Sequence, residues 1–138
     1  MKFAVLLPAL MLSVAAIAAP PKTRLLDFST ESLLSAETAR AVFTEHIPAK
    51  VWKLYPANKW VFVSQVEGGV TAAGVCVITA RVMLLPLTPT MKAVMLRPEK
   101  IATAFASQAG ATLAACQALA KTKLVEATSA VVSALVKV

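Results

Sequence analysis

The side chains with the most reactive chemistry in this sequence are two cysteines, Cys76 and Cys116, and a single histidine, His46. A cysteine beside a histidine can act as a nucleophile, because the imidazole takes up the thiol proton. Such a thiol needs an electropositive, partly exposed setting, whereas both cysteines lie in apolar stretches. His46 precedes Pro48 at the end of a predicted helix, where a histidine more often contacts the last carbonyls. A small hydrolase using His46 is therefore the weakest functional hypothesis.

Other common reactive sites are missing from the sequence. It holds no CxxC or HExxH spacing, no glycine-rich phosphate loop before a helix and no Gly-x-Ser-x-Gly turn. The seven carboxylates are single residues spread from Asp27 to Glu126, so no pair is placed for glycoside hydrolysis. We expect no catalytic residues, no metal and no cofactor, and hence a protein that is not an enzyme.

Cys76 belongs to an apolar stretch whose period is two. In a strand over residues 75–85, one face carries Cys76, Ile78, Ala80, Val82 and Leu84, and the other carries Val75, Val77, Thr79, Arg81 and Met83. A transmembrane helix is the alternative, but Arg81 near its centre would cost at least about 2.5 kcal/mol. Glycines before the stretch and Pro86 after it also favour a strand.

Cys116 belongs to a segment with strong helical character. Thr112 can cap it, alanine and leucine are abundant, and neither glycine nor proline interrupts it before Val138. A helix over about residues 112–137 places one apolar stripe along its length, consisting of Leu113, Cys116, Ala120, Leu124, Ala127, Val131, Ala134 and Leu135. Three valines lie beside the stripe, namely Val125, Val132 and Val136. Either the N-terminal helix covers them, or they form an interface with a partner or a second copy.

The N-terminus resembles a secretory signal peptide. Lys2 gives a positive start, residues 3–12 are almost wholly apolar, and Ala16-Ile17-Ala18 offers small residues at the cleavage position. An uncleaved anchor is the alternative, although the apolar stretch is shorter than the roughly 20 residues of a bilayer span. We expect cleavage after residue 18, an extended arm over 19–34 and one domain over 35–138. The protein would then be periplasmic or secreted and not an integral membrane protein.

Export to an oxidising compartment gives the two cysteines a structural role. Each lies on the apolar face of an element, and the helix is expected to cover the strand, so we predict a Cys76–Cys116 disulfide. In the chain-entropy model a loop of about 40 residues gives about 4 kcal/mol. Two free buried thiols remain the alternative.

The rest of the chain completes an α+β fold. Ser35 as a helix-start residue, followed by helical spacing, predicts an N-terminal helix over about residues 35–47, which Pro48 ends. Alternating residues predict strands over about 60–66 and 75–85, with turn residues Glu67-Gly68-Gly69 after the first. Residues 70–74 either join the second strand through a bulge at Gly74 or form a longer connection. Further strands are predicted over about 92–96 and, with a weaker alternation, over 101–107. We expect an antiparallel sheet of three to four strands with both helices on one face.

Charge narrows the possible partners. The net charge is +7, of which Lys2 supplies one unit, so residues 19–138 carry +6. This excess favours acidic proteins, anionic lipids or cell-wall polymers. The basic residues are scattered singly and do not interleave with aromatics, so we expect no nucleic-acid binding.

Two features predict a binding surface. The irregular segment 47–59 combines positive charge with aromatic rings, and Arg81 is unexplained on the second face of its strand. The candidate partner-binding residues are Lys50, Trp52, Lys53, Tyr55, Lys59 and Arg81. The alternative is that Trp52 and Trp60 cover the core beside solvated lysines. The leading hypothesis is an exported protein that binds another protein or a second copy, as an inhibitor or immunity-type factor would. Binding of anionic envelope material is second.

Overall fold

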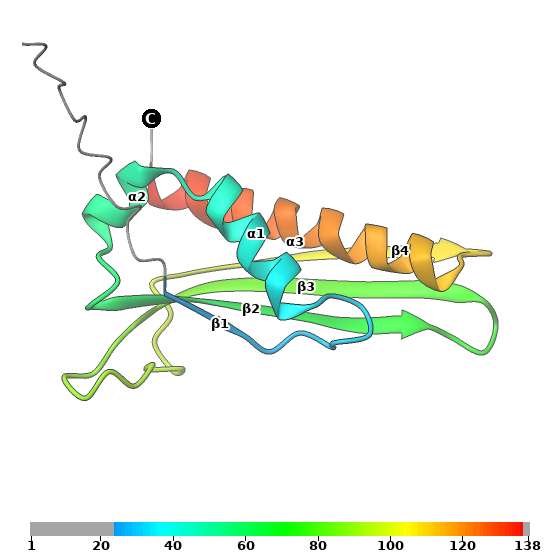
Figure 1. Cartoon of the computed structure of the whole chain (residues 1–138), viewed down its shortest axis with the longest axis horizontal. Helices are drawn as coiled ribbons and strands as arrows, with labels where there is room; N and C mark the ends of the chain where they lie inside the picture. The colour runs from blue at the N-terminus through cyan, green and yellow to red at the C-terminus, as the bar shows by residue number, and fades with distance from the viewer. Residues whose placement is uncertain (1–23, 137–138) are drawn as a thin grey trace, which may run out of the picture.

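The computed structural model describes residues 24–136 as a four-stranded sheet with helices on one side (Figure 1). The predicted leader, residues 1–18, lies outside the described residues. The elements in chain order are β1 Leu25–Asp27, α1 Ala36–His46, α2 Ala49–Leu54, β2 Trp60–Val70, β3 Val75–Pro86, β4 Lys100–Ala109 and α3 Leu113–Leu135. The predicted α+β class and the number of strands are confirmed.

The strands lie in the order β1-β2-β3-β4. The pairs β2–β3 and β3–β4 are antiparallel, as expected. β1 comes from the predicted extended arm and pairs in parallel with β2, with Leu25 opposite Phe62. The sheet is therefore mixed, and β1 and β4 are its edges.

The end of β2 and one whole strand were predicted wrongly. β2 does not turn at Gly68-Gly69 but continues to Val70, and the turn is formed by residues 71–74. Residues 92–96 form no strand and make one isolated bridge, between Leu87 and Ala93. The reason is that β4 occupies the edge of β3 from Val75 to Leu84, so no partner is left for 92–96. The weaker prediction, 101–107, is a strand and extends to Lys100–Ala109.

The helices begin at the residues that the sequence marks as caps. Ser35 Oγ accepts the N–H of Thr38 at 3.2 Å, and Thr112 Oγ1 accepts that of Ala115 at 3.2 Å. Each cap satisfies an N–H that has no partner inside the helix. The predicted loop 47–59 contains the short helix α2 directly after Pro48.

The core lies between the helices and one face of the sheet. The predicted face of β3, with Cys76, Ile78, Ala80, Val82 and Leu84, is fully buried. Cys76 and Cys116 form a disulfide with their Cα atoms 5.6 Å apart, so β3 and α3 are covalently joined as predicted. The same core is also contacted by three partly buried valines of α3 and its C-cap, namely Val125, Val132 and Val136.

The opposite face of the sheet is only partly covered. The connection between β3 and β4 lies on the side away from α3 (Figure 1). Its Leu87 and Ala93 pack on a small second cluster made of Val61, Val63, Met83 and Leu85. Beyond this cluster, no described element packs on that face.

Candidate functional site

The uncovered part of the sheet is the candidate binding surface, and we call it the open face. Successive side chains of a strand point to opposite faces, so every second residue lies on the open face. The open face begins where Leu87 and Ala93 no longer cover the sheet. The open face consists of Gln65, Glu67, Val77, Thr79, Arg81, Ile101, Thr103, Phe105 and Ser107, with Leu26 and Phe28 at the β1 edge.

Arg81 occupies the centre of the open face. It lies opposite Gln65 on β2 and Thr103 on β4 and is exposed. The nearby carboxylate of Glu67 accepts a 2.6 Å hydrogen bond from Gln65 Nε2. Within residues 24–136, no carboxylate lies within ion-pair distance of Arg81, whose guanidinium makes no hydrogen bond to another described side chain. Its donors are therefore free to bind water or an external acceptor.

Large apolar side chains are exposed on the same face as Arg81. Phe105 is 62% exposed and Ile101 52%, both on β4. Across the sheet, Phe28 is 58% and Leu26 39% exposed. Scattered exposed apolar residues are normal, but these four share one face with an unpaired arginine. Aromatic residues and arginine are enriched at protein interfaces, and charged residues as a class are depleted from interface cores.

The far end of the open face is hollowed. Gly68, Gly69, Val70, Thr71 and Val77 line a shallow depression of ≈ 240 Å³. Gly68 has a φ of +125°, and a Cβ there would lie 1.9 Å from the carbonyl oxygen of Val77. Glycine at this position lets β2 and β3 approach closely.

The residues predicted to bind a partner fall into two separate places. Trp52 is 8% exposed, and its ring lies 5.3 Å from that of Phe62, so it belongs to the core. Tyr55 is partly buried and stacks edge-on against Trp60 at 5.3 Å. Lys50, Lys53 and Lys59 are exposed near α2. α2 lies on the helix side of the sheet (Figure 1), so the structure does not bring Arg81 together with these residues.

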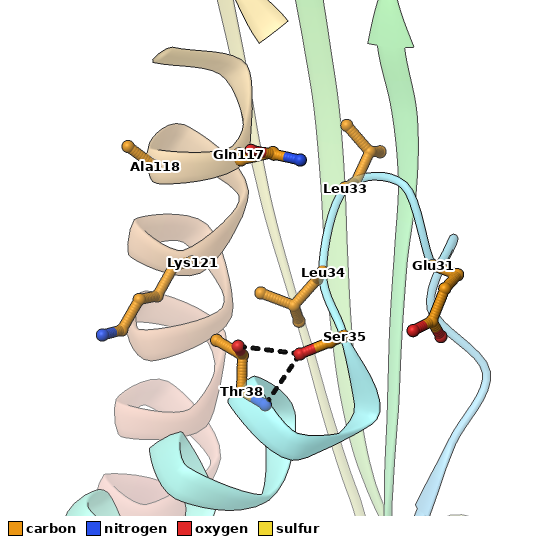
Figure 2. Close-up of a pocket in the computed structure, with 8 residues that line it drawn as sticks. All are labelled: Glu31, Leu33, Leu34, Ser35, Thr38, Gln117, Ala118 and Lys121. Atoms are coloured by element: carbon orange, nitrogen blue, oxygen red, sulfur yellow. Dashed lines mark hydrogen bonds between the residues drawn. The ribbon is translucent and has the colours of Figure 1, made fainter. Parts of the chain in front are cut away.

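A second hollow lies on the helix side, between the N-terminus of α1 and α3 (Figure 2). It measures ≈ 370 Å³, and Glu31, Leu34, Gln117 and Lys121 are among its lining residues. The Ser35 and Thr38 hydroxyls hydrogen-bond to each other at 2.9 Å, and Gln117 Nε2 donates to the carbonyl of Ser32 at 2.8 Å. The Ser35–Thr38 pair thus belongs to the cap of α1, and Gln117 joins α3 to the segment before α1.

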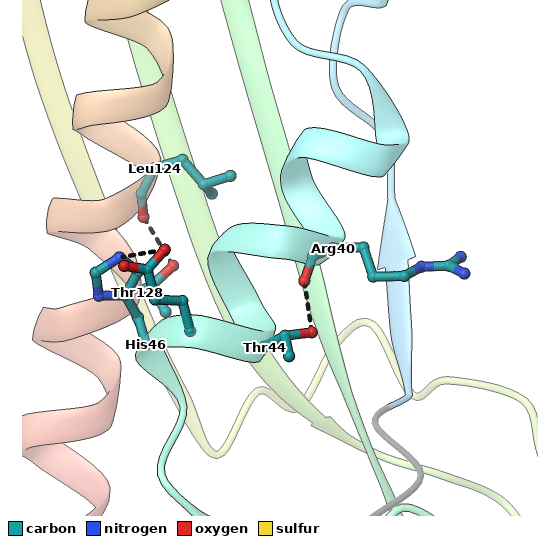
Figure 3. A network of polar contacts seen from close by, with 6 residues as sticks. Arg40, Thr44, His46, Leu124 and Thr128 are labelled. Carbon is teal, nitrogen blue, oxygen red and sulfur yellow. Dashed lines mark hydrogen bonds and ion pairs between the residues drawn. The ribbon is translucent and has the colours of Figure 1, made fainter. Parts of the chain in front are cut away.

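His46 lies in the last turn of α1, beside α3 (Figure 3). Its Nε2 is 3.9 Å from the carboxylate of the adjacent Glu45. Both cysteines are bonded to each other, so neither supplies a thiolate to His46. Among the described residues, no three His, Cys, Asp or Glu side chains gather as metal ligands do. Within the same part of the chain, no helix combines the length and hydropathy of a membrane span.

The aromatic residues of the open face were missed from the sequence, although a signal for Phe105 was present. In β4 the even-numbered positions include three alanines, Ala102, Ala104 and Ala106. The odd-numbered positions include the larger Ile101 and Phe105. Small side chains on one face of a strand let a helix pack closely on that face. The large side chains then lie on the opposite, uncovered face. Phe28 had no comparable signal, because it follows a three-residue strand.

Comparisons of the chain with models of known families, with curated proteins and with solved structures give no match.

Proposed function

We propose that this chain is a small exported, non-enzymatic protein that binds another protein on its open face. The observation that carries the proposal is the unpaired Arg81 at the centre of a sheet face that also exposes Phe28, Ile101 and Phe105. The sheet holds the backbone of Arg81, Ile101 and Phe105 in regular strands, so little backbone freedom is lost on binding. An inhibitor or an immunity-type factor acts by this kind of surface recognition.

The proposed partner has a carboxylate set among apolar groups. A carboxylate can accept two parallel N–H donors from the Arg81 guanidinium. The apolar side chains on the same face would help to exclude water from that pair, and the net charge of +6 over residues 19–138 would speed the approach of an acidic surface.

The proposed location is the periplasm or the extracellular space. The Cys76–Cys116 disulfide is of the kind that persists in oxidising compartments. The leader predicted over residues 1–18 would deliver the chain there.

Site-specific photocrosslinking in the producing cells tests the proposal. A photoreactive amino acid replaces Phe28 on the open face or, as the control, Ser129 on the exposed side of α3. We expect one discrete adduct with another protein from position 28 and none from position 129. The additional substitution Arg81→Glu should remove the adduct while export continues. Absence of an adduct at 28, or the same adducts at 129, would contradict the proposal.

A second candidate function, binding of anionic envelope material, rests on the lysines near α2. Lys50, Lys53 and Lys59 are exposed there, and Leu54 beside them is 55% exposed. Basic residues with an exposed apolar side chain suit anionic headgroups. Sedimentation with phosphatidylglycerol vesicles should then fall steeply with added salt and with Lys50→Gln/Lys53→Gln, whereas Arg81→Gln, which removes one cation elsewhere, should change it little.

A further inference from the structure

The outer edge of β4 is an unpaired strand edge in the described part of the chain. β4 pairs with β3 over its whole length and has no second strand partner. The backbone bonds outside regular elements leave Ile101–Ala109 untouched, and no described side chain bonds to this segment. Alternate N–H and C=O groups along this edge therefore point outward.

β4 also lacks the features that usually protect an edge strand. From Ile101 to Ala109 it contains no charge, no proline and no glycine. Natural edge strands are kept from pairing by lysines, prolines, bulges or short length. The opposite edge, β1, has only three residues. The β4 edge is thus suited to pairing with a further strand.

We propose that β4 pairs antiparallel with β4 of a second copy around a twofold axis at Phe105. The two sheets then form one continuous eight-stranded sheet. Residues opposite each other in such a pair must share a face, so their numbers sum to an even value. An axis at Phe105 sets Phe105 opposite Phe105, Thr103 opposite Ser107, and Ile101 opposite Ala109.

This register uses favourable cross-strand pairs. Aromatic–aromatic pairs and Thr–Ser hydrogen bonds both stabilise antiparallel strands. On the helix side, Ala104 lies opposite Ala106, so no large side chains meet there. Lys100, the charged residue at the end of β4, lies opposite Gly110 at the far end of the other copy, which keeps the two lysines apart.

Charge favours a second copy over an acidic strand from another protein. The segment Ile101–Ala109 has no cation to select an acidic sequence, whereas its own sequence supplies the matching pairs. Each copy is positively charged overall, so the two repel at long range. The dimer should tighten when salt rises to about 0.15 M, because the Debye length then falls to about 8 Å. An acidic partner would respond to salt in the opposite direction.

Sedimentation equilibrium of the purified, oxidised chain tests the proposal. We expect a reversible dimer. In Thr103→Glu/Ser107→Glu, each glutamate faces a glutamate of the other copy, and the dissociation constant should rise at least about tenfold. In Thr103→Glu/Ser107→Lys the facing charges are opposite, and dimerisation should return. Since Thr103 lies beside Arg81 in the sheet, glutamate there is compatible with the folded monomer.

A cysteine trap tests the register. Phe105→Cys places identical thiols directly opposite each other, within disulfide range, and should give a covalent dimer on mild oxidation. In Thr103→Cys the two thiols lie four residues apart along the strand, about 13 Å, and should not crosslink. Circular dichroism of both variants checks that they fold.

A chain that stays monomeric at all concentrations overturns the proposal. So does a dimer that Thr103→Glu/Ser107→Glu leaves intact, or a disulfide crosslink that forms through Thr103→Cys and not through Phe105→Cys. These measurements use the purified chain alone, whereas the proposed function is tested by adducts with another protein, so either idea can fail without the other.

Discussion

Ser64 Oγ donates a 2.6 Å hydrogen bond to Oδ1 of Asp27, which lies 37 residues earlier in the chain. The same Oδ1 accepts from Ser29 Oγ at 2.7 Å, and Ser29 Oγ accepts the N–H of Val66 at 3.0 Å. Ser64 is fully buried, so water cannot replace Asp27 as its partner. These contacts hold β1 against β2, and with it the part of the open face that carries Phe28.

Asp27→Ala is therefore expected to destabilise the fold. It leaves the buried Ser64 hydroxyl without an acceptor, which should lower the free energy of unfolding by about 1–3 kcal/mol. The double variant Asp27→Ala/Ser64→Ala should lose less free energy of unfolding than the two single variants lose together, because it has no unpaired hydroxyl. Urea unfolding of the four chains measures this coupling. A loss no larger than that of the exposed control Glu31→Ala would contradict it.

Much of the fold could be predicted because its signals are local. Period-two alternation identified the two faces of β3, and the caps Ser35 and Thr112 marked the starts of α1 and α3. The disulfide followed from placing Cys76 and Cys116 on facing apolar surfaces. These inferences needed only the pattern of residues within one segment and, for the disulfide, the expectation that the helix covers the strand.

The errors arose where pairing depends on competition between distant segments. After Lys92, residues 93–96 are apolar, yet Leu96 is 94% exposed, because the longer β4 takes the edge of β3. β1 is too short to show a period and is fixed by Asp27 contacts that only the folded chain provides. For the site, Arg81 could be singled out as an isolated charge in an apolar strand, whereas the neighbours across the sheet depend on register.

The Cys76–Cys116 disulfide should be intact in the folded protein and should contribute much of its stability. Removing a native disulfide from a small secreted domain typically costs about 2–5 kcal/mol. We expect Cys76→Ala/Cys116→Ala to lower the free energy of unfolding by this amount, measured in urea. The mass of the unreduced, denatured protein after alkylation is the second measurement. Two alkylated thiols would contradict the bond.

Gly68→Ala should destabilise the protein more than Gly69→Ala does. Both glycines have positive φ, +125° and +144°, so each change carries backbone strain of about 1–3 kcal/mol. At Gly68 the added Cβ also meets the Val77 carbonyl oxygen at 1.9 Å, whereas at Gly69 nothing lies within 4 Å. Comparing the two variants therefore separates the destabilisation caused by a clash between β2 and β3 from that caused by backbone strain alone. Equal midpoints in thermal unfolding would show that the backbone moves aside at no cost.

Trp52→Ala should act on stability rather than on recognition. The Trp52 ring packs edge-on against Phe62 in the core, and truncating a buried tryptophan costs about 3–5 kcal/mol. Lys53→Ala on the same helix removes an exposed side chain and should change stability by less than about 0.5 kcal/mol. Unfolding in urea separates the two. If Trp52→Ala were as stable as Lys53→Ala, the ring would not belong to the core. If Trp52→Ala is destabilised as expected, lost binding would follow from unfolding, so recognition near α2 must be tested through the exposed lysines.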